Sequence, residues 1–208
     1  MPIAKKEVRE FRGISDVVIA KIKVDSAEAL TYDEVQHLAG AAKLSKTTEV
    51  NQETKYYDNK AALVVTAEGD DTISIDISAL DLETLALISG RKYDKTTKSM
   101  IESEAEVVYF ALGYKTQDTA GHTRYVWRYK VQFTIPNEEY NTKSGDASSN
   151  GQTIEAKCVY PTHEFTYKLD DKEVTESVKA FNISDEGTYN VDAFLETVTT
   201  PDVVLPVE

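Results

Sequence analysis

The sequence has few of the features that stabilise small secreted proteins or anchor proteins in membranes. Its single cysteine, Cys158, excludes an intrachain disulfide and favours a reducing compartment. No run of about 18 apolar residues is present, which argues against a membrane-spanning helix. Charged residues stand at Glu7, Arg9 and Glu10, where a secretory signal has apolar ones. A chain of 208 residues can bury a sizeable core, so residues 1–208 are predicted to form a single domain.

Basic residues are scarce and unevenly placed. The chain has 23 Lys and Arg against 36 Asp and Glu, a formal net charge of −13. This excess argues against a protein that wraps nucleic acid, because phosphate contacts need clustered Lys and Arg. Residues 1–23 hold six basic and three acidic residues, whereas residues 164–208 hold three lysines and eleven acidic residues. Opposite charges at the two ends suggest head-to-tail contacts between copies of the chain, and two solvated ends account for them equally well.

Residues that carry catalysis or bind cofactors are sparse as well. His37, His122 and His163 are scattered, whereas a zinc site needs three or four convergent ligands. Cys158 stands in a strand-like pattern and is expected to be a buried, unreactive thiol. No phosphate-binding glycine loop is present. The sequence therefore predicts no catalytic residue, no cofactor, no metal site, and a protein that is not an enzyme.

The centre of the chain has a clear strand pattern. Apolar residues recur at every second position in a candidate core strand: Tyr125, Trp127, Tyr129, Val131 and Phe133. Period-two alternation predicts one buried face and one solvent-exposed face. The apolar run from Val107 precedes this strand across a polar, Gly-containing stretch, Thr116–His122, so a β-hairpin is predicted. Pro136 is expected to end the second strand because it lacks a backbone N–H.

The remaining pattern predicts a mainly β fold, a β-sandwich or β-barrel with one flanking helix and a long hairpin loop. Further strands are expected at Ile14–Val24, Val35–Val50, Thr54–Glu68, Thr72–Ile77, Thr153–Tyr160 and Glu164–Leu169. Residues 43–60 are predicted to form a long polar hairpin loop with its tip at Asn51-Gln52-Glu53. Terminal arms are expected at residues 1–13 and 199–208, the latter extended, and a mobile loop at residues 141–152.

Helical signals are few. Residues 81–89 have apolar residues at helical spacing, with Asp81 as the N-cap and Gly90 as the C-terminal residue in a left-handed conformation. Weaker patterns predict helices at Asn190–Val198 and Glu173–Phe181. Twelve tyrosines are present, and the adjacent pair Tyr56-Tyr57 is interpreted as an interface or hairpin element because Tyr provides large contact area at low entropic cost.

The order of several motifs resembles a known family. The motifs are Leu30-Thr31-Tyr32, His37-Leu38-Ala39-Gly40-Ala41, Tyr56-Tyr57-Asp58-Asn59, Leu82-Glu83-Thr84-Leu85, Phe110-Ala111-Leu112-Gly113-Tyr114-Lys115, Arg124-Tyr125-Val126-Trp127-Arg128-Tyr129-Lys130, then Phe133, Pro136, Glu138-Glu139, Thr142-Lys143 and Phe194. Together they resemble the major tail proteins, or tail-tube subunits, of long non-contractile-tailed bacteriophages, in particular the phi13-type group. The resemblance spans roughly residues 14–143 and is weaker from Gly145 onward.

This resemblance implies a structural protein of the virion tail that is assembled in the host cytoplasm. Such subunits form hexameric rings that stack into a tube, and DNA passes through its lumen without specific binding. The implied partners are further copies, the tape measure protein, the tail terminator and the baseplate or tip, with no membrane. On the hairpin, the candidate contacts between rings are Lys46, Glu49, Glu53, Lys55, Tyr56, Tyr57 and Asp58.

Three alternatives remain open from the sequence. A different tail component, such as a terminator or a head–tail connector, has a related fold. A carbohydrate-binding or adhesive β-sandwich is a rival class, although the N-terminus offers no secretion route. An enzyme is the third. For the tail reading, carboxylates lining the lumen would repel DNA phosphates and let DNA slide.

Overall fold

The computed structural model describes residues 7–140 and 151–207. The fold is mainly β, as predicted, and all of its strand pairs are antiparallel. The elements are β1 (Phe11–Asp25), β2 (Leu30–Tyr32), β3 (Gln36–His37), β4 (Ala41–Tyr57), β5 (Lys60–Ile77), α1 (Leu82–Ser89), β6 (Lys92–Asp94), β7 (Ser99–Ile101), β8 (Phe110–Asp118), β9 (Thr123–Phe133), β10 (Gln152–Cys158), β11 (Phe165–Leu169), β12 (Lys172–Glu176), β13 (Ala180–Ser184) and α2 (Pro201–Val204).

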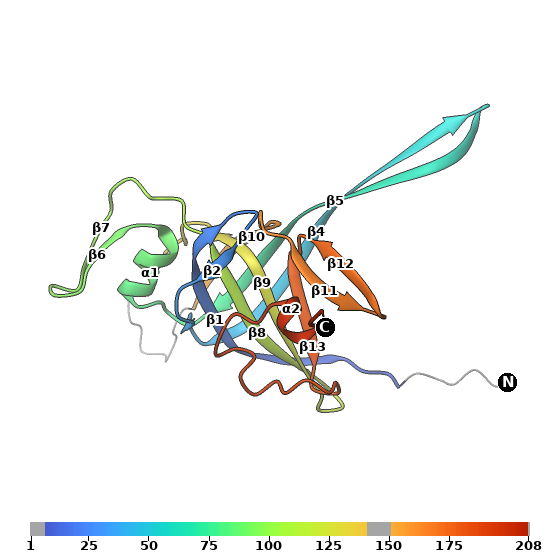
Figure 1. The fold of residues 1–208 in the computed structure, drawn as a ribbon. Coiled ribbons are helices and arrows are strands. Elements are labelled where there is room, and N and C mark those ends of the chain that lie inside the picture. Colours follow the sequence, from blue (N-terminus) through green and yellow to red (C-terminus); the bar gives the residue numbers. More distant parts are fainter. Residues whose placement is uncertain (1–6, 141–150, 208) are drawn as a thin grey trace.

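One nine-stranded sheet dominates the fold (Figure 1). Its order is β2-β1-β8-β9-β10-β5-β4, with β3 pairing with β1 and β13 pairing with β9. The sheet curves strongly. Val17 and Ile19 of β1 pack in the same core cluster as Ile73 and Ile75 of β5, although three other strands lie between β1 and β5 in the order. Two small hairpins, β6–β7 and β11–β12, lie outside this sheet.

The central strands are buried on both faces. Inside the curve, Phe110 and Leu112 of β8 pack in the first core cluster. On the opposite face, Trp127 and Tyr129 pack with Phe165 and Phe194 from the C-terminal part of the chain. Two hydrogen bonds join this cover to the sheet: Trp127 Nε1 donates to the carbonyl of Phe194 at 2.7 Å, and the Tyr129 hydroxyl donates to the carbonyl of Thr199 at 2.8 Å.

A β-bulge in β9 divides the predicted core strand between these two faces. Phe110 pairs with Val131 and Leu112 pairs with Arg128, so three residue steps of β9 oppose two of β8. The bulge reverses the alternation. Tyr125, Trp127 and Tyr129 therefore belong to the outer cluster, whereas Val131 and Phe133 belong to the inner one. The prediction of one buried and one solvent-exposed face is wrong, and Arg128, expected on the exposed face, is only 6% exposed.

Helix α1 forms where the sequence predicts it. Asp81 accepts a hydrogen bond from the Thr84 amide at 2.9 Å, and Gly90 ends the helix at φ 66°. The helices predicted at Glu173–Phe181 and Asn190–Val198 do not form. The first range is occupied by β12 and the start of β13, since pairing with β11 and β9 overrides its weak helical pattern, and the second consists of turns. Within the described ranges, no helix is long and apolar enough to span a membrane.

The chain ends differ in part from the predicted arms. Residues 7–10 have no regular structure, and β1 begins at Phe11, inside the arm predicted at residues 1–13. The segment predicted as an extended C-terminal arm contains α2, and Leu205 accepts a backbone hydrogen bond from Lys168 of β11 at 2.9 Å. Most of the loop predicted at residues 141–152 lies outside the described residues.

Gly113 of β8 lies where the outer core has no space for a side chain. A Cβ atom at this position would lie 2.8 Å from Trp127 Cη2 and Cζ3 and 2.8 Å from Val18 Cγ2. We expect Gly113→Ala to lower the free energy of unfolding by about 1–3 kcal/mol through overpacking, measured by urea denaturation. Gly40→Ala is the matched control, because its Cβ would meet only Ser78 at ordinary contact distance. Equal midpoints for the two variants would contradict this packing.

Candidate assembly surface

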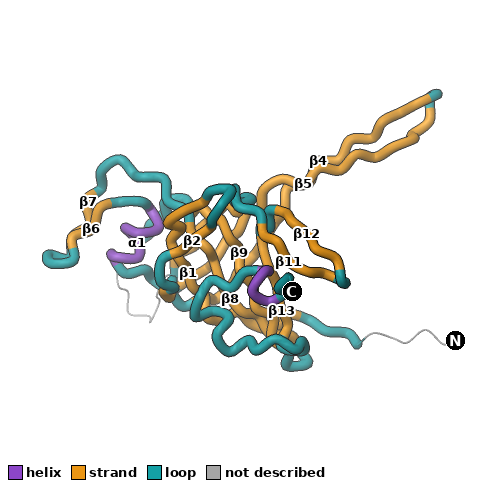
Figure 2. The backbone as a smooth tube through the Cα atoms, in the orientation of Figure 1, coloured by secondary structure: helices purple, strands orange, loops and turns teal. Residues whose placement is uncertain are grey.

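The β4–β5 hairpin extends far beyond the rest of the sheet, as Figure 1 shows. The two strands pair with each other from Ala41 and Ile77 to Tyr57 and Lys60. On its other edge, β5 pairs with β10 only at Asp71–Ile77. The portion from Val50 to Glu68 therefore pairs only with itself in the described structure, and Figure 2 shows it as an isolated two-stranded ribbon. Both of its edges present unpaired backbone groups.

The hairpin turns at Asp58-Asn59, which corrects the tip predicted at Asn51–Glu53. Asp58 has φ 50° and Asn59 has φ 61°, the left-handed conformations that a two-residue type I′ turn requires. Asp and Asn tolerate this conformation better than most residues. The residues from Asn51 to Glu53 lie inside β4 instead, paired with Ala67, Thr66 and Val65.

Large apolar side chains are exposed along this ribbon. They are Val50, Tyr56, Tyr57, Leu63, Val64 and Val65, each between 46% and 68% exposed. An isolated two-stranded hairpin is marginally stable in water, and clustered exposed apolar side chains mark interaction surfaces. The ribbon is therefore the best candidate for a surface that is covered in an assembly.

A buried charge cluster holds the root of the hairpin. Asp71 of β5 is 2% exposed and accepts hydrogen bonds from Thr48 Oγ1 at 2.8 Å and Arg128 Nη1 at 2.7 Å. Lys179 Nζ lies 3.2 Å from Asp71 Oδ1 and 2.9 Å from Glu68 Oε1, and it also donates to the carbonyl of Gly69 at 3.1 Å. The cluster thus connects the two strands of the hairpin to β9 and to the segment before β13.

The charges in this cluster stabilise one another. Burial alone would raise the pKa of Asp71, but hydrogen bonds from Thr48 and Lys179 and the positive charge of Arg128 lower it below its ordinary value. Burial alone would lower the pKa of Lys179, but Glu68 and Asp71 raise it. Both groups are therefore charged at neutral pH. Removing Asp71 leaves the buried Arg128 and Lys179 without the carboxylate between them.

A groove separates the two ends of the curved sheet. It has a volume of about 630 Å³ and lies between the first residues of β1 and the first half of β4. Residues of β8, β9 and β13 complete its lining. Phe11–Ser15 of β1 pair only with β8, and β4 pairs only with β5, so two free strand edges border the groove within the described structure. Its charged lining residues are all basic: Lys43, Lys46, Arg124 and Arg128.

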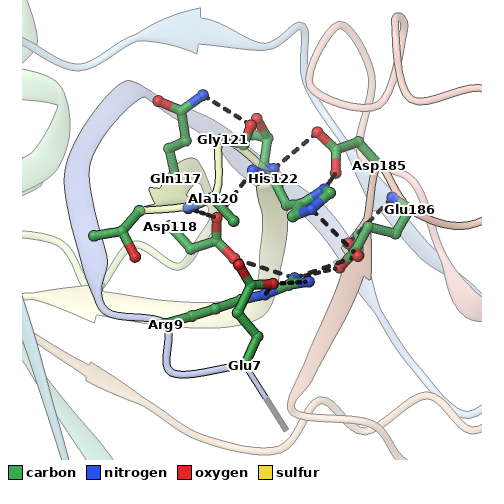
Figure 3. A network of polar contacts seen from close by, with 12 residues as sticks. Glu7, Arg9, Gln117, Asp118, Ala120, Gly121, His122, Asp185 and Glu186 are labelled. Atoms are coloured by element: carbon green, nitrogen blue, oxygen red, sulfur yellow. Dashed lines mark hydrogen bonds and ion pairs between the residues drawn. The ribbon is translucent and has the colours of Figure 1, made fainter.

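A second polar network fixes the N-terminal segment beside the β8–β9 turn (Figure 3). Arg9 Nη1 lies 3.1 Å from Glu186 Oε2 and 3.4 Å from Asp118 Oδ2. Asp118 Oδ1 accepts backbone hydrogen bonds from Ala120 at 2.9 Å and His122 at 3.0 Å, within the turn. Burial alone would raise the pKa of Asp118, but these hydrogen bonds and the Arg9 charge lower it. The network positions the start of β1 beside the groove.

Comparisons with known proteins give a weak likeness to a solved structure. No protein-family model and no curated protein matches the chain. Among solved structures, it is similar to a chain in the cryo-EM structure of the anti-feeding prophage (AFP) baseplate, 6-fold symmetrised. The two chains are 10% identical, the match covers 87% of this chain and 97% of that chain, and the TM-score is 0.29. A TM-score this low carries no argument about function.

The candidate ring contacts are distributed along the hairpin rather than gathered at its tip. Lys46 lies at the root, 3.8 Å from Asp71, and Glu49 packs beside Gly69. Farther out, Glu53 pairs with Lys55. Tyr56 and Tyr57 are exposed next to the turn that contains Asp58. In the candidate core strand, Trp127, Tyr129, Val131 and Phe133 are buried and Tyr125 is half-buried.

Sequence reasoning missed the charge cluster. Lys179 lies in a segment predicted to be helical, whereas it pairs with Asp71 at the root of the hairpin. One signal was present: Asp71 has the same period-two phase as Ile73, Ile75 and Ile77, all of which are buried. The three histidines lie apart, and within the described residues no three His, Cys, Asp or Glu side chains are grouped to hold a metal ion.

Proposed function

We propose that this chain is a structural subunit that assembles with further copies of itself, and that the assembly is a phage tail tube of stacked hexameric rings. The observation that carries the proposal is the β4–β5 ribbon, whose edges are unpaired and whose apolar side chains are exposed. In a monomer such a ribbon promotes aggregation, whereas in a polymer the next copy covers it. The sequence resemblance over roughly residues 14–143 supports the tail-tube form of the assembly.

The ribbon is assigned to the contact between rings. It projects to one side of the sheet (Figure 1), so it can reach a neighbouring ring. Its exposed residues Tyr56, Tyr57 and Val64 would supply the apolar contact. Within a ring, head-to-tail contacts between different surfaces close when their rotation closes, which yields a cyclic assembly. The tape measure protein, the terminator and the baseplate or tip are the expected partners at the ends of the tube, in the virion tail.

The proposed subunit acts by geometry and electrostatics rather than by catalysis. A net charge of −13 disfavours lasting contact with DNA phosphates, so DNA would slide through the lumen without being held. Part of this charge lies in residues 164–208, so only the carboxylates that face the lumen contribute. A cryo-EM map of the assembled tube tests this point: a lumen lined mainly by Lys and Arg would contradict it.

Negative-stain microscopy of the concentrated, purified chain tests the proposed function. Tubes with a regular ring repeat are the expected result. Single closed rings that do not stack would favour the tail terminator or connector alternative. A persistent monomer that binds glycans on an array would contradict self-assembly and favour the adhesive β-sandwich.

A further inference from the structure

We propose that the groove between β1 and β4 binds an acidic segment, Glu102–Glu106, of a second copy of this chain. This inference rests on the proposed self-assembly and identifies two surfaces that would meet within it. The groove is a basic site on a protein that is acidic overall, because four of its lining residues are basic and none is acidic.

Two of the basic groups have no carboxylate of their own. Lys43 and Arg124 make no ion pair within the described residues, and Arg124 lies over the ring of Phe11 at 5.0 Å. Lys46 and Arg128 share Asp71 with Lys179. The groove therefore presents positive charge that its own surroundings do not neutralise, which favours an anionic occupant.

The strand edges that border the groove also have unused hydrogen-bonding capacity. The strand edges at Phe11–Ser15 and at the first half of β4 are free to bind the backbone of an added segment. A volume of about 630 Å³ is within the range of ligand sites and accommodates a few side chains. These features fit a short polypeptide segment with carboxylate side chains.

The loop after β7 is an exposed acidic segment. It reads Ile101-Glu102-Ser103-Glu104-Ala105-Glu106-Val107, without a basic residue, and all seven residues are exposed. The Glu106 amide donates to the carbonyl of Gly90 at 2.9 Å, and Glu102 pairs with Arg91 at 3.0 Å, so the loop is held to the α1 region. Glu104 and Glu106 make no ion pair within the described part of the chain. They are the carboxylates assigned to the groove.

The loop and the groove are different surfaces of one subunit. In Figure 1 the loop lies with α1 and β7 at the upper left, whereas the start of β1 and β13, which line part of the groove, lie at the lower right; the start of β4, which lines another part, lies between them. One copy therefore presents the loop to the groove of the next. A contact between different surfaces of identical copies is heterologous and builds a ring when its rotation closes.

Charge reversal tests the pairing in the full-length chain. Lys43→Glu with Arg124→Glu, and separately Glu104→Lys with Glu106→Lys, should each raise the concentration needed for assembly about tenfold or more, measured by sedimentation velocity. The chain that carries all four substitutions should regain assembly. Lys157→Glu with Lys172→Glu, and Asp192→Lys with Glu196→Lys, are controls with the same changes of net charge. Failure of the fourfold variant to recover, or equal losses in the controls, would overturn the pairing.

A peptide experiment separates this inference from the proposed function. A fluorescein-labelled peptide of residues 100–108 should bind the wild-type chain, measured by fluorescence anisotropy, and bind Lys43→Glu/Arg124→Glu about tenfold or more weakly. If the chain assembles but does not bind the peptide at millimolar concentration, the groove pairing is overturned and the proposed function is not. A chain that binds the peptide but stays monomeric supports the groove and overturns the proposed function.

Discussion

A chain in which residues 51–67 are replaced by Asn-Gly is expected to fold normally and to lose the ability to form tubes. Val50 and Glu68 are already paired, so a two-residue turn joins them without changing the register. The replacement keeps Thr48, Glu68 and Asp71 in the charge cluster. It removes only the ribbon, which pairs with no other strand among the described residues, so assembly should be lost while the core stays intact.

Negative-stain microscopy and thermal unfolding measure the two effects separately. The melting temperature of the shortened chain should stay close to that of the wild type while tubes disappear. A milder variant, Tyr56→Ser with Val64→Thr, keeps the hairpin and should weaken tube formation. Ile135→Thr with Leu169→Ser removes exposed apolar side chains elsewhere and serves as its control. Normal tubes from the shortened chain would refute the bridging role of the ribbon.

Asp71→Ala is expected to be the most destabilising single substitution at the root of the hairpin. It leaves Arg128 and Lys179, whose side chains are each 8% exposed, without the carboxylate between them. Breaking a buried ion pair in this way costs about 3–5 kcal/mol of unfolding free energy, measured by urea denaturation. Asp70→Asn, one residue earlier and without a described ion pair, should change stability by less than about 0.5 kcal/mol. Equal stability of the two variants would show that the cluster does not hold the fold.

The pH dependence of stability provides an independent check on Asp71. Its folded-state pKa lies below the ordinary value of 3.8, so its contribution is complete above that value and is lost as the pH falls through the folded pKa. The stability difference between the wild type and Asp71→Asn should therefore be largest near neutral pH and shrink below about pH 4. A difference that stays constant from pH 7 to pH 3 would contradict the lowered pKa.

The predictions that succeeded rest on local signals. The Asp81 cap and the Gly90 terminus of α1 need only neighbouring residues, and the β8–β9 hairpin is encoded by two runs around one turn. The turn at Asp58-Asn59 is also encoded locally, because Asp and Asn tolerate a left-handed backbone. The prediction instead followed the polar composition of Asn51–Glu53 and placed the turn there. Long alternating strands can accommodate polar residues without turning when both faces are in water.

The failures concern features set by distant parts of the chain. The bulge in β9 becomes visible only once its pairing with β8 is known. Asp71 and Arg128 are 57 residues apart, and Glu68 and Lys179 are 111 residues apart, so no spacing rule links them. The groove likewise depends on how far the sheet curves before β1 and β4 meet, which no pattern within a strand specifies.

The C-terminal cover of the sheet has a consequence for synthesis. Trp127 and Tyr129 are enclosed only when Phe194 and Thr199 have been made, and 67 residues separate Trp127 from Phe194. At roughly 5–20 residues per second, the ribosome needs about 3–13 seconds to add them. During that interval, Trp127 and Tyr129 have been synthesised but the residues that cover them have not. These aromatic side chains are therefore exposed to water in the nascent chain. The yield of native subunit in a host cell should therefore depend on how well chaperones shield incomplete chains.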